Sequence, residues 1–349
     1  MLARVHFIYH RIGHHSDHSG YDQLVKYIPH TDIKPSWLGR YAEGMDAERL
    51  DQWIKGAPLI WYSKQKLVME ADAAWLFFKT TRHIYHYLYG EDFYYYLSKI
   101  PNLMRNRIVV SYHQPPSFFP KAVLRTDHVK KADAIITVSK KQKEYFSEIV
   151  GEDRVFFVPH GVDTEFFHPP PLNPLPHETK RCLFVGHWLR DIDTLVNVIR
   201  AFQSRGITNV RFIIVTFEKH FEKFRDLKQV DLLTGVSADD LLRLYQTCDL
   251  LYLPLLDSTA NNTILEAMAC GLPIVTTDVG GVRDYVDEKS TVLLPQGNVD
   301  AAVGTLSELL WNSDRLSDLS SYARQRATGF NWPIVASKML EVYERITNG

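Results

Sequence analysis

The chain has 349 residues, of which 45% are hydrophobic, and this length predicts two packed cores because single cores stop growing near ~250 to 300 residues. Its 40 basic and 41 acidic side chains leave a net charge of -1, which argues against a nucleic-acid-binding protein. The three cysteines show neither metal-ligand spacing nor an even disulfide framework, so they predict buried small side chains and a reducing cytoplasmic compartment.

The first element is a short strand at residues 5–9, V-H-F-I-Y, followed by a Gly-containing loop and a helix from Tyr21. This order is typical of the start of a Rossmann-like half. The loop lacks G-x-G-x-x-G, so Gly13 and Gly20 are either plain turn residues or points where the backbone approaches a ligand. Residues 1–12 are too short and too polar for a signal peptide, and no apolar run reaches membrane-spanning length.

Two aromatic segments follow this half-motif. Residues 71–78, A-D-A-A-W-L-F-F, predict a strand or a buried helix end. Residues 83–97 are rich in tyrosine, and tyrosines spaced along helices favour core and half-buried rim positions. The second interpretation of this segment is a surface that faces a sugar or a lipid.

A buried parallel strand is predicted at residues 107–112, R-I-V-V-S-Y, and it ends at His113. Ligands of open α/β sheets bind beyond the carboxyl ends of the strands, so His113 is expected where chemistry occurs. The alternative is a structural histidine bound to a backbone carbonyl.

Residues 121–143 hold seven basic side chains against two acidic ones, which predicts either solvated helix ends or attraction to an anionic surface. Further strands are expected at residues 132–139 and 155–163. Five prolines within residues 168–177 then predict a stiff linker between domains.

The second half repeats the alternation of strands and helices. The strands are expected at residues 181–186, 210–215, 230–236 and 249–254, with a helix that Ser237 caps at residues 237–245. Residues 257–281 predict a turn, a short helix, an apolar strand and a Gly-Gly loop. Strand-helix repeats in both halves predict two parallel sheets, each covered on both faces.

Four segments together carry a family resemblance: V-P-H-G-V-D-T-E-F-F-H-P, L-F-V-G, G-V-S-A-D-D-L-L-R-L-Y-Q-T-C-D-L-L-Y-L-P and N-T-I-L-E-A-M-A-C-G-L-P-I-V-T-T-D-V-G-G. They resemble the retaining glycosyltransferases of family four, the group 1 glycosyltransferases, from about residue 107 to the end of the chain. The resemblance implies an α/β protein of the GT-B fold, in which two Rossmann-like domains with parallel sheets face a central cleft. The expected acceptor-side domain covers residues 1–167, a linker residues 168–179 and the nucleotide-sugar-binding domain residues 180–329, while residues 330–349 form a helix that returns to the first domain.

The family's signature is a pair of glutamates separated by seven residues. The second corresponds to Glu266, which the resemblance implies binds the ribose hydroxyls of the donor; alternatively Thr263 and Glu266 form a capping box. The first glutamate falls on Ser258, and the adjacent Asp257 is one residue out of register. The resemblance therefore leaves the contact to the donor sugar open between Asp257 and Ser258.

Asn261 and Asn262 replace small residues of the family, and their amides either bind the sugar or cap the helix. The N–H groups of residues 262–265, Thr263 among them, are expected to face the diphosphate.

The family places an arginine directly after the glycine that corresponds to Gly186, and a lysine shortly beyond it. Here the two positions read His187 and Ile192, so Arg190 is the expected partner of the diphosphate, unless it pairs with Asp191 or Asp193.

Three further site assignments come from the resemblance. Gly235 and Val236 correspond to the segment whose backbone contacts the base. His113 matches the histidine of the acceptor half that is required for transfer, and Gly13 and Gly20 are assigned to the acceptor side.

The expected activity is a metal-independent, retaining hexosyltransferase that uses no cofactor and serves polysaccharide or glycolipid biosynthesis. Its partners are a nucleotide-diphosphate sugar and a saccharide or lipid-linked acceptor, without nucleic acid. The chain is expected in the cytoplasm, with peripheral association at the inner face of the membrane as a further expectation. The alternative function is a non-catalytic, nucleotide-sugar-binding partner subunit of a glycosyltransferase complex.

Overall fold

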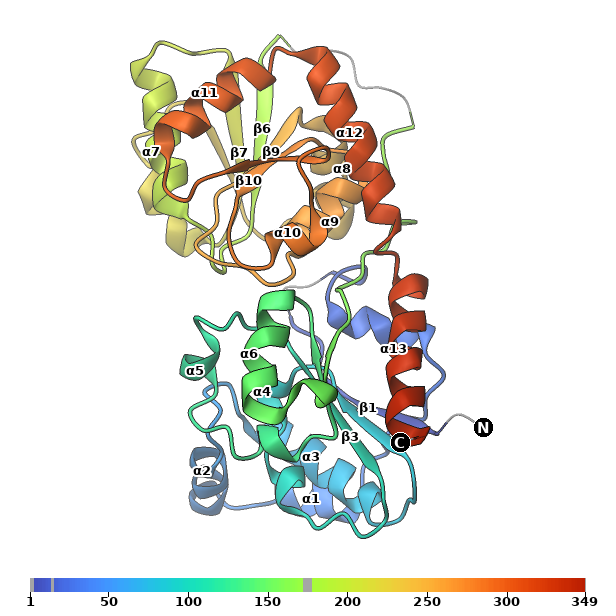
Figure 1. Cartoon of the computed structure of the whole chain (residues 1–349). Helices are drawn as coiled ribbons and strands as arrows, with labels where there is room; N and C mark the ends of the chain where they lie inside the picture. Colours follow the sequence, from blue (N-terminus) through green and yellow to red (C-terminus); the bar gives the residue numbers. More distant parts are fainter. Residues whose placement is uncertain (1–2, 14–15, 172–177, 349) are drawn as a thin grey trace. The chain divides into compact units, whose positions relative to one another are not determined.

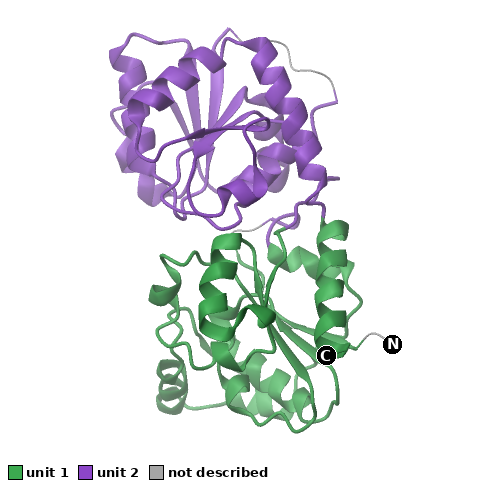
Figure 2. Cartoon of the chain, viewed as in Figure 1, with its two compact units in different colours: residues 1–13, 21–160, 332–349 green, residues 14–20, 161–331 purple. Residues whose placement is uncertain are grey.

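The computed structural model describes residues 3–13, 16–171 and 178–348. The chain divides into two compact units (Figure 2). Unit 1 holds residues 1–13, 21–160 and 332–349, and unit 2 holds residues 14–20 and 161–331. Both units are α/β folds with a parallel sheet, as the alternating pattern predicts. The proline-rich segment predicted as a linker starts inside unit 2, and its residues 172–177 lie outside the described residues.

Unit 1 is built on a parallel sheet whose strands pair in the order in which they occur in the chain. The strands are β1 (Val5–Ile8), β2 (Ile84–Tyr87), β3 (Arg107–Tyr112), β4 (Ala134–Thr137) and β5 (Val155–Phe157). Because all of them run in one direction, the segments after β1, β2 and β3 gather at one edge of the sheet.

Helices pack on both faces of this sheet, as β2 illustrates. Tyr85 and Tyr87 point toward α3, where Tyr85 meets Phe77, while His86 between them bonds to Tyr343 of α13 at 2.6 Å. The helical elements of unit 1 are η1 (Tyr21–Tyr27), α1 (Trp37–Glu43), α2 (Ala47–Gly56), α3 (Lys64–Phe77), α4 (Gly90–Phe93), η2 (Tyr96–Lys99), α5 (Phe119–Ala122), η3 (Val129–Lys131), α6 (Lys140–Val150), η4 (Glu152–Arg154) and α13 (Trp332–Asn348).

The tyrosine-rich segment differs from the expectation of helical spacing, because it begins as strand β2 and continues through two short helices. Its tyrosines are core residues: Tyr85, Tyr87, Tyr89, Tyr94 and Tyr95 are each at most 8% exposed. Glu70 of α3 lies beneath them and accepts hydrogen bonds from three consecutive backbone N–H groups at residues 95–97. The core interpretation is therefore confirmed, and a sugar- or lipid-facing platform at these tyrosines is wrong.

Unit 2 has a six-stranded parallel sheet in the order β11-β10-β9-β6-β7-β8. The strands are β6 (Lys180–Val185), β7 (Val210–Val215), β8 (Val230–Leu233), β9 (Leu250–Leu253), β10 (Ile274–Thr277) and β11 (Thr291–Leu294). Counted from β6, this is the doubly wound order 6-5-4-1-2-3, whose direction of winding reverses between β6 and β9. The loops that leave these two strands flank the place where such folds bind ligands.

The helices of unit 2 cover both faces of its sheet (Figure 1). Helix α7 contacts α11, and α9 contacts α12. They comprise α7 (Ile192–Ser204), η5 (Glu218–Phe224), α8 (Ala238–Thr247), α9 (Asn262–Ala269), α10 (Val282–Tyr285), α11 (Val299–Leu309) and α12 (Ser313–Thr328). Ser237 caps α8 as predicted, accepting a hydrogen bond from the backbone N–H of Asp240.

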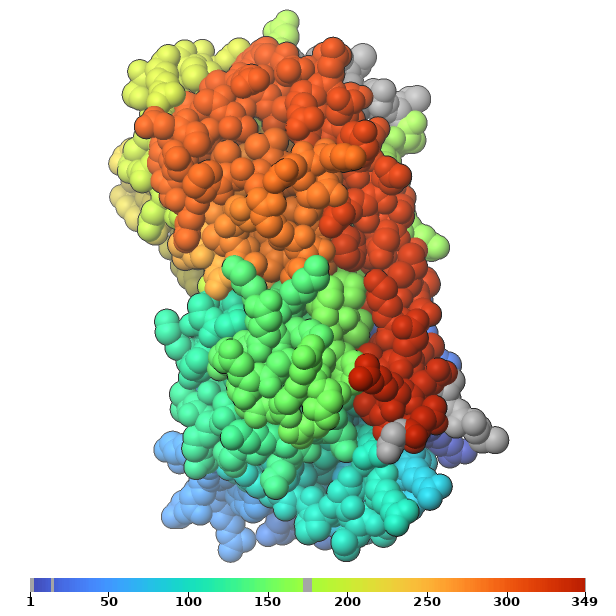
Figure 3. Space-filling model, viewed as in Figure 1, coloured from blue at the N-terminus to red at the C-terminus, as the bar shows by residue number. Residues whose placement is uncertain are grey.

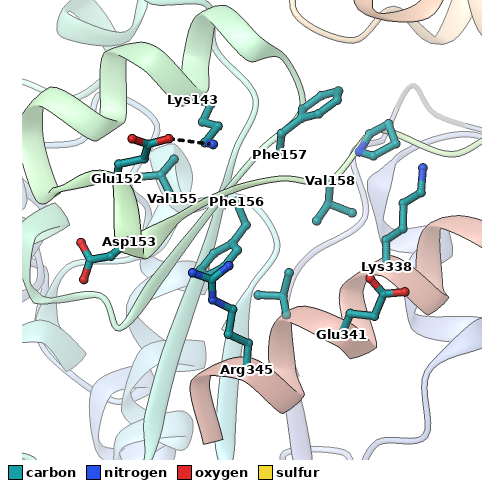
Figure 4. A pocket seen from close by; sticks show the side chains of 12 residues that line it. Lys143, Glu152, Asp153, Val155, Phe156, Phe157, Val158, Lys338, Glu341 and Arg345 are labelled. Atoms are coloured by element: carbon teal, nitrogen blue, oxygen red, sulfur yellow. Dashed lines mark hydrogen bonds and ion pairs between the residues drawn. The ribbon is translucent and has the colours of Figure 1, made fainter. Parts of the chain in front are cut away.

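One pocket of about 770 Å³ lies in unit 1, where β5, η4 and Lys143 of α6 meet α13. The red C-terminal segment lies beside the green segment that carries β5 in the space-filling view (Figure 3). The guanidinium of Arg345 stacks over Phe156, and Lys143 pairs with Glu152 (Figure 4). None of the residues predicted to bind donor or acceptor lines this pocket.

Candidate functional site

The loops after β6 and β9 are tied together at the point where the winding of unit 2 reverses. The backbone N–H of Asp191 donates to the carbonyl of Pro254, and that of Leu256 donates to the carbonyl of Leu189, both at 2.9 Å. Helix α9 follows the second loop, so its N-terminus lies against the segment of residues 186–190. The site is built on this joined pair of loops.

Arg190 fastens the pair further. Its Nε donates to the Val185 carbonyl and one Nη to the Trp188 carbonyl, while the other Nη donates to Asn261 Oδ1 and Thr263 Oγ1, all within 3.2 Å. Four of the five N–H donors of the guanidinium are therefore used inside the protein. Burial lowers the pKa of Arg190 to about 10, which leaves it charged at neutral pH.

Gly186 permits this arrangement. Its φ is 102°, and a Cβ added there would lie 3.0 Å from an Nη of Arg190. The alternative in which Arg190 pairs with its neighbours is wrong, because Asp191 caps α7 and Asp193 binds Lys223.

Helix α9 is capped by Asn261, whose side chain accepts a hydrogen bond from the backbone N–H of Ile264. The capping box of Thr263 and Glu266 is therefore wrong, since Thr263 lies inside the helix and bonds to Arg190 instead. The backbone N–H groups of Asn262 and Thr263 have no partner within the described part of the chain. They remain as donors at the positive end of the helix dipole.

Glu266 projects from α9 and is 5% exposed. Its Oε2 accepts a hydrogen bond from the Tyr245 hydroxyl at 2.9 Å and its Oε1 one from Ser19 Oγ at 2.6 Å. Burial raises the pKa of Glu266 to about 7, although the bonds from Ser19 and Tyr245 and the nearby Arg190 oppose the shift. The carboxyl is thus fixed in orientation and titrates near neutral pH.

Ser19 is a residue of the site that the sequence analysis missed. It belongs to the segment of residues 16–20, which is part of unit 2 although the chain on either side of it builds unit 1. His18 holds the segment down: its Nδ1 lies 2.8 Å from Asp163 Oδ2, and its ring stacks on Phe166 at 3.6 Å. Ser19 and Glu266 are separated by 247 positions in the sequence, so no local sequence pattern predicts their contact.

The two candidates for the missing carboxylate differ in accessibility. Ser258 is 5% exposed, and its hydroxyl bonds within its own loop. Asp257 is half-buried, and its Oδ1 accepts a hydrogen bond from the Ser258 N–H. Gly280 packs directly on this loop, since a Cβ there would lie 2.0 Å from the carbonyl oxygen of Ser258. The loop is therefore held by the Gly-Gly segment that follows β10.

The remaining predicted donor residues follow neighbouring strands. The half-buried His187, after β6, packs against Phe217, after β7, with ring centroids 4.0 Å apart and the rings tilted by 31°. Gly235 and Val236 follow β8, and Gly235 is exposed. Because β7 and β8 are paired, Phe217 and Gly235 lie at the same edge of the sheet. Phe217, which the motifs did not single out, is 39% exposed.

His113 of unit 1 follows β3, and its Nε2 lies 2.7 Å from the carbonyl oxygen of Leu88. A carbonyl only accepts hydrogen bonds, so Nε2 carries a proton and the backbone contact of the structural alternative is present. Burial lowers the pKa of His113 to about 4, against that hydrogen bond, so the ring is neutral at pH 7. Of the two acceptor-side glycines, Gly13 is exposed and Gly20 is buried.

Among the residues that the structure describes, no three or more His, Cys, Asp or Glu side chains gather in a way that could hold a metal ion. In the same part of the chain, no helix has the length and apolarity needed to cross a bilayer.

Comparison with known proteins connects this geometry to a family. Residues 179–312 match the family model described as glycosyl transferases group 1. The chain is similar to a D-inositol 3-phosphate glycosyltransferase of Kineococcus radiotolerans, with 25% identity over 252 residues, which covers 62% of this chain and 58% of that protein. A protein of the same description from Salinispora arenicola is 37% identical over 116 residues, covering 33% and 26%. The chain thus spans less than two thirds of the length of the curated relatives it matches.

Solved structures share the fold. Anabaena HepE in complex with UDP-glucose superimposes with a TM-score of 0.68 at 16% identity, covering 98% of this chain and 99% of that chain. Sucrose-phosphate synthase from Thermosynechococcus elongatus gives a TM-score of 0.62 at 18% identity, with 89% and 78% covered. The GT-B fold and the resemblance to group 1 glycosyltransferases, both predicted from the motifs, are confirmed.

Proposed function

We propose that this chain, whose motifs and relatives resemble group 1 glycosyltransferases, transfers a sugar from a nucleotide-diphosphate sugar to an acceptor hydroxyl. The observation that carries the proposal is the arrangement at the winding reversal of unit 2. There the buried carboxyl of Glu266 and two N–H groups without a partner in the described part of the chain belong to the short helix α9. The guanidinium of Arg190 comes from the loop that is bonded to this helix.

Each part suits one portion of the donor. Glu266 binds the ribose, because a carboxylate accepts hydrogen bonds from two neighbouring hydroxyls, and the donor displaces Ser19 as it does so. The N–H groups of Asn262 and Thr263 and the charge of Arg190 stabilise the diphosphate. Gly235 and Val236 contact the base. Since Arg190 already makes four hydrogen bonds within the protein, it acts as a fixed positive charge and not as a bidentate hydrogen-bond donor to the phosphate oxygens.

In the transfer itself the acceptor oxygen bonds to the anomeric carbon and the bond from that carbon to the diphosphate breaks. The diphosphate leaves with the bonding electron pair and takes up the proton of the acceptor hydroxyl. We propose a front-face displacement with retention, through an oxocarbenium-like transition state. The fixed guanidinium and helix N-terminus supply positive charge where the leaving group develops negative charge, which supports a metal-independent reaction.

Donor choice is set at residues 257–262. A buried serine stands where the family has a carboxylate, so the half-buried Asp257 and the amide of Asn262 are the groups we expect to meet the sugar hydroxyls. The amide of Asn261 is committed to the helix cap and to Arg190.

The test is a panel of UDP-, GDP- and ADP-sugars with mixed saccharide acceptors, in which nucleotide release and product are followed. We expect turnover with one donor class, loss of donor binding in Glu266→Ala, and loss of transfer with donor binding retained in His113→Ala. The stereochemistry of the new bond, read by NMR, decides between retention and inversion, and full activity in a chelator supports metal independence.

A non-catalytic partner subunit is the second candidate function, and Ser258 is the observation that favours it, since this position lacks the signature carboxylate. Such a subunit binds a nucleotide sugar through Glu266 without turning it over. Saturable binding in calorimetry, together with no nucleotide release from any donor in the panel, would select this function over the enzyme.

We also propose a cytoplasmic protein that meets a lipid-linked acceptor at the membrane surface. The support is the basic window of residues 121–143, in which Lys121, Lys130, Lys131, Lys140 and Lys141 are exposed and Leu124 is 64% exposed. Co-sedimentation with anionic vesicles at low salt and release at high salt are the expected results, and neutral vesicles serve as the control. Equal sedimentation with both vesicle types would contradict this part.

A further inference from the structure

A second group of polar side chains lies in unit 1, at the carboxyl edge of its sheet. His10 comes just after β1, and Asp92 belongs to α4, which follows β2. His10 Nε2 lies 3.3 Å from Asp92 Oδ2, and the same oxygen receives a hydrogen bond from Lys66 Nζ at 2.9 Å. The motifs assigned a role to none of these residues.

The neighbouring Glu91 joins this group to His113. Its Oε1 accepts a hydrogen bond from the His113 N–H at 2.9 Å, and the N–H of Gln114 also bonds to it. Tyr89 lies between the two histidines, with its ring centroid 5.7 Å from that of His10 and 5.1 Å from that of His113. The histidine that the family resemblance marks for transfer therefore shares one cluster with His10 and Asp92.

Polar atoms of this cluster lack partners. His10 Nδ1, Glu91 Oε2 and Gln114 Oε1 are buried without a hydrogen bond in the described part of the chain. Glu91 as a whole is only 2% exposed. An unpaired buried polar group typically costs about 1 to 3 kcal/mol, so their concentration at one edge points to a ligand that supplies the missing bonds.

The kind of atom left unpaired defines the class of ligand. The Nε2–H of neutral His10 faces Asp92, so its Nδ1 offers a lone pair. Together with Gln114 Oε1, this makes two buried acceptors that need donors. Burial raises the pKa of Glu91 to about 8, helped by the charge of Asp92, so its carboxyl adds one O–H donor at neutral pH. Sugar hydroxyls both donate and accept, whereas a phosphate dianion only accepts.

The charges of the cluster agree with this class. The ammonium of Lys66 already donates two of its three N–H groups, to Asp92 and to the carbonyl of Trp61, and its charge is paired with Asp92. Asp22, which accepts a hydrogen bond from the Tyr89 hydroxyl, contributes a second carboxylate. Arg11 follows His10 and is exposed, so it is a cation that a phosphate could contact.

We propose that His10 and Asp92 form the acceptor subsite of this chain, and that they bind and orient an uncharged saccharide or polyol hydroxyl beside His113. The proposal rests on the transferase function given above and names its acceptor class. It separates the chain from the relatives, whose names specify a phosphorylated inositol acceptor. The side chains of His10 and Asp92, 20% and 15% exposed, give the hydroxyl access to the cluster.

The first experiment measures binding without turnover, on the full chain. Ligand-observed saturation-transfer NMR is run with methyl α-glucoside, methyl α-galactoside, methyl α-mannoside and myo-inositol, and with glucose 6-phosphate and inositol 3-phosphate as charged counterparts. We expect signal from at least one neutral probe and about tenfold weaker binding of that probe in Asp92→Asn and in His10→Asn. Binding of no neutral probe, or tighter binding of a phosphorylated probe that Arg11→Met abolishes, would overturn the proposal.

The second experiment uses turnover. In Asp92→Asn we expect kcat/KM for the acceptor to fall about tenfold, with the KM for the donor unchanged. Asp127→Asn, an exposed aspartate of unit 1 paired with Lys99, is the matched control. An equal fall in the affinity for the donor would show that Asp92 only maintains the fold.

The two proposals fail in different ways. A wild-type chain that turns over no donor yet binds neutral saccharides through Asp92 defeats the transferase function and keeps the subsite. A chain that transfers normally with Asp92→Asn defeats the subsite and keeps the function.

Discussion

The carboxyl edges of the two sheets differ in how far their polar atoms are already satisfied. In unit 2 Arg190 uses four of its donors and Glu266 both of its oxygens within the protein. In unit 1 the cluster around Asp92 and Glu91 keeps several atoms without partners. A site whose groups are held in place loses little freedom when it binds, so we expect unit 2 to be prepared for the proposed donor and unit 1 to be completed by its proposed ligand.

The largest expected effect comes from removing the charge of Glu266, whose two oxygens both accept hydrogen bonds within unit 2. Glu266→Gln keeps the shape of the side chain but replaces one acceptor oxygen by an amide donor. We expect nucleotide affinity to fall about 10- to 100-fold, because hydrogen bonds to a charged group contribute about 1.5 to 3 kcal/mol. Calorimetric titration with the nucleotide measures it, and the exposed Glu308→Gln is the control. Unchanged affinity would remove Glu266 from the donor site.

Replacing Arg190 by lysine tests whether the hydrogen bonds of its guanidinium stabilise the carboxyl edge of the sheet of unit 2. A lysine cannot reach the Val185 and Trp188 carbonyls and the side chains of α9 at once, so we expect unit 2 to lose about 1 to 3 kcal/mol of stability and the donor to bind less tightly. Thermal unfolding followed by circular dichroism gives the stability. Arg243→Lys, at an exposed ion pair on α8, is the control and should change nothing.

Glu91 gives the corresponding test for the unsatisfied edge. Its pKa is raised to about 8 by burial, so the unfolded state ionises at lower pH than the folded state, and unit 1 should lose stability as the pH rises from about 5 to 8. Glu91→Gln mimics the protonated carboxyl, and we expect about 1 to 2 kcal/mol of added stability at pH 8 but none at pH 5. Urea unfolding at the two pH values measures this. Equal effects at both would contradict the assignment.

The smallest expected effect is at the contact between Ser19 and Glu266. Ser19→Ala removes the hydroxyl that a ribose has to displace, and we expect nucleotide affinity to rise about two- to fivefold, since a hydrogen bond contributes about 1 kcal/mol. The same titration serves. A fall in affinity would mean that Ser19 binds the donor along with Glu266.

The positions of the candidate site residues in unit 2 could be predicted from sequence because these residues lie in short contiguous motifs. A turn, a short helix, a Gly-Pro corner and a strand place residues 257–281, and the spacing of the motifs places Gly186 after β6 and Glu266 on the helix that follows the neighbouring β9. The spacing could not predict which residue caps the N-terminus of α9. Asn261 and Thr263 are both suitable N-cap residues, and the bond of Thr263 to Arg190 decides between them.

Unit 1 was less predictable for a related reason. The composition of its tyrosine-rich segment is compatible with either a strand or a helix. The turn at residues 95–97 is explained by the buried carboxyl group of Glu70, on an earlier helix, which accepts hydrogen bonds from the three backbone N–H groups. The cluster of His10, Asp92 and His113 likewise depends on which strands are neighbours. A sequential strand order is not encoded in any single segment.

The path of the chain through the two units has a consequence for protein engineering. Residues 16–20 and 332–348 each belong to the unit opposite to the one that their neighbours in sequence build. A hybrid enzyme that took residues 161–331 from a relative would therefore keep Ser19 and His18 of the original chain against a foreign partner. Exchange of donor specificity by recombination should succeed only when the short segment is transplanted together with the long one.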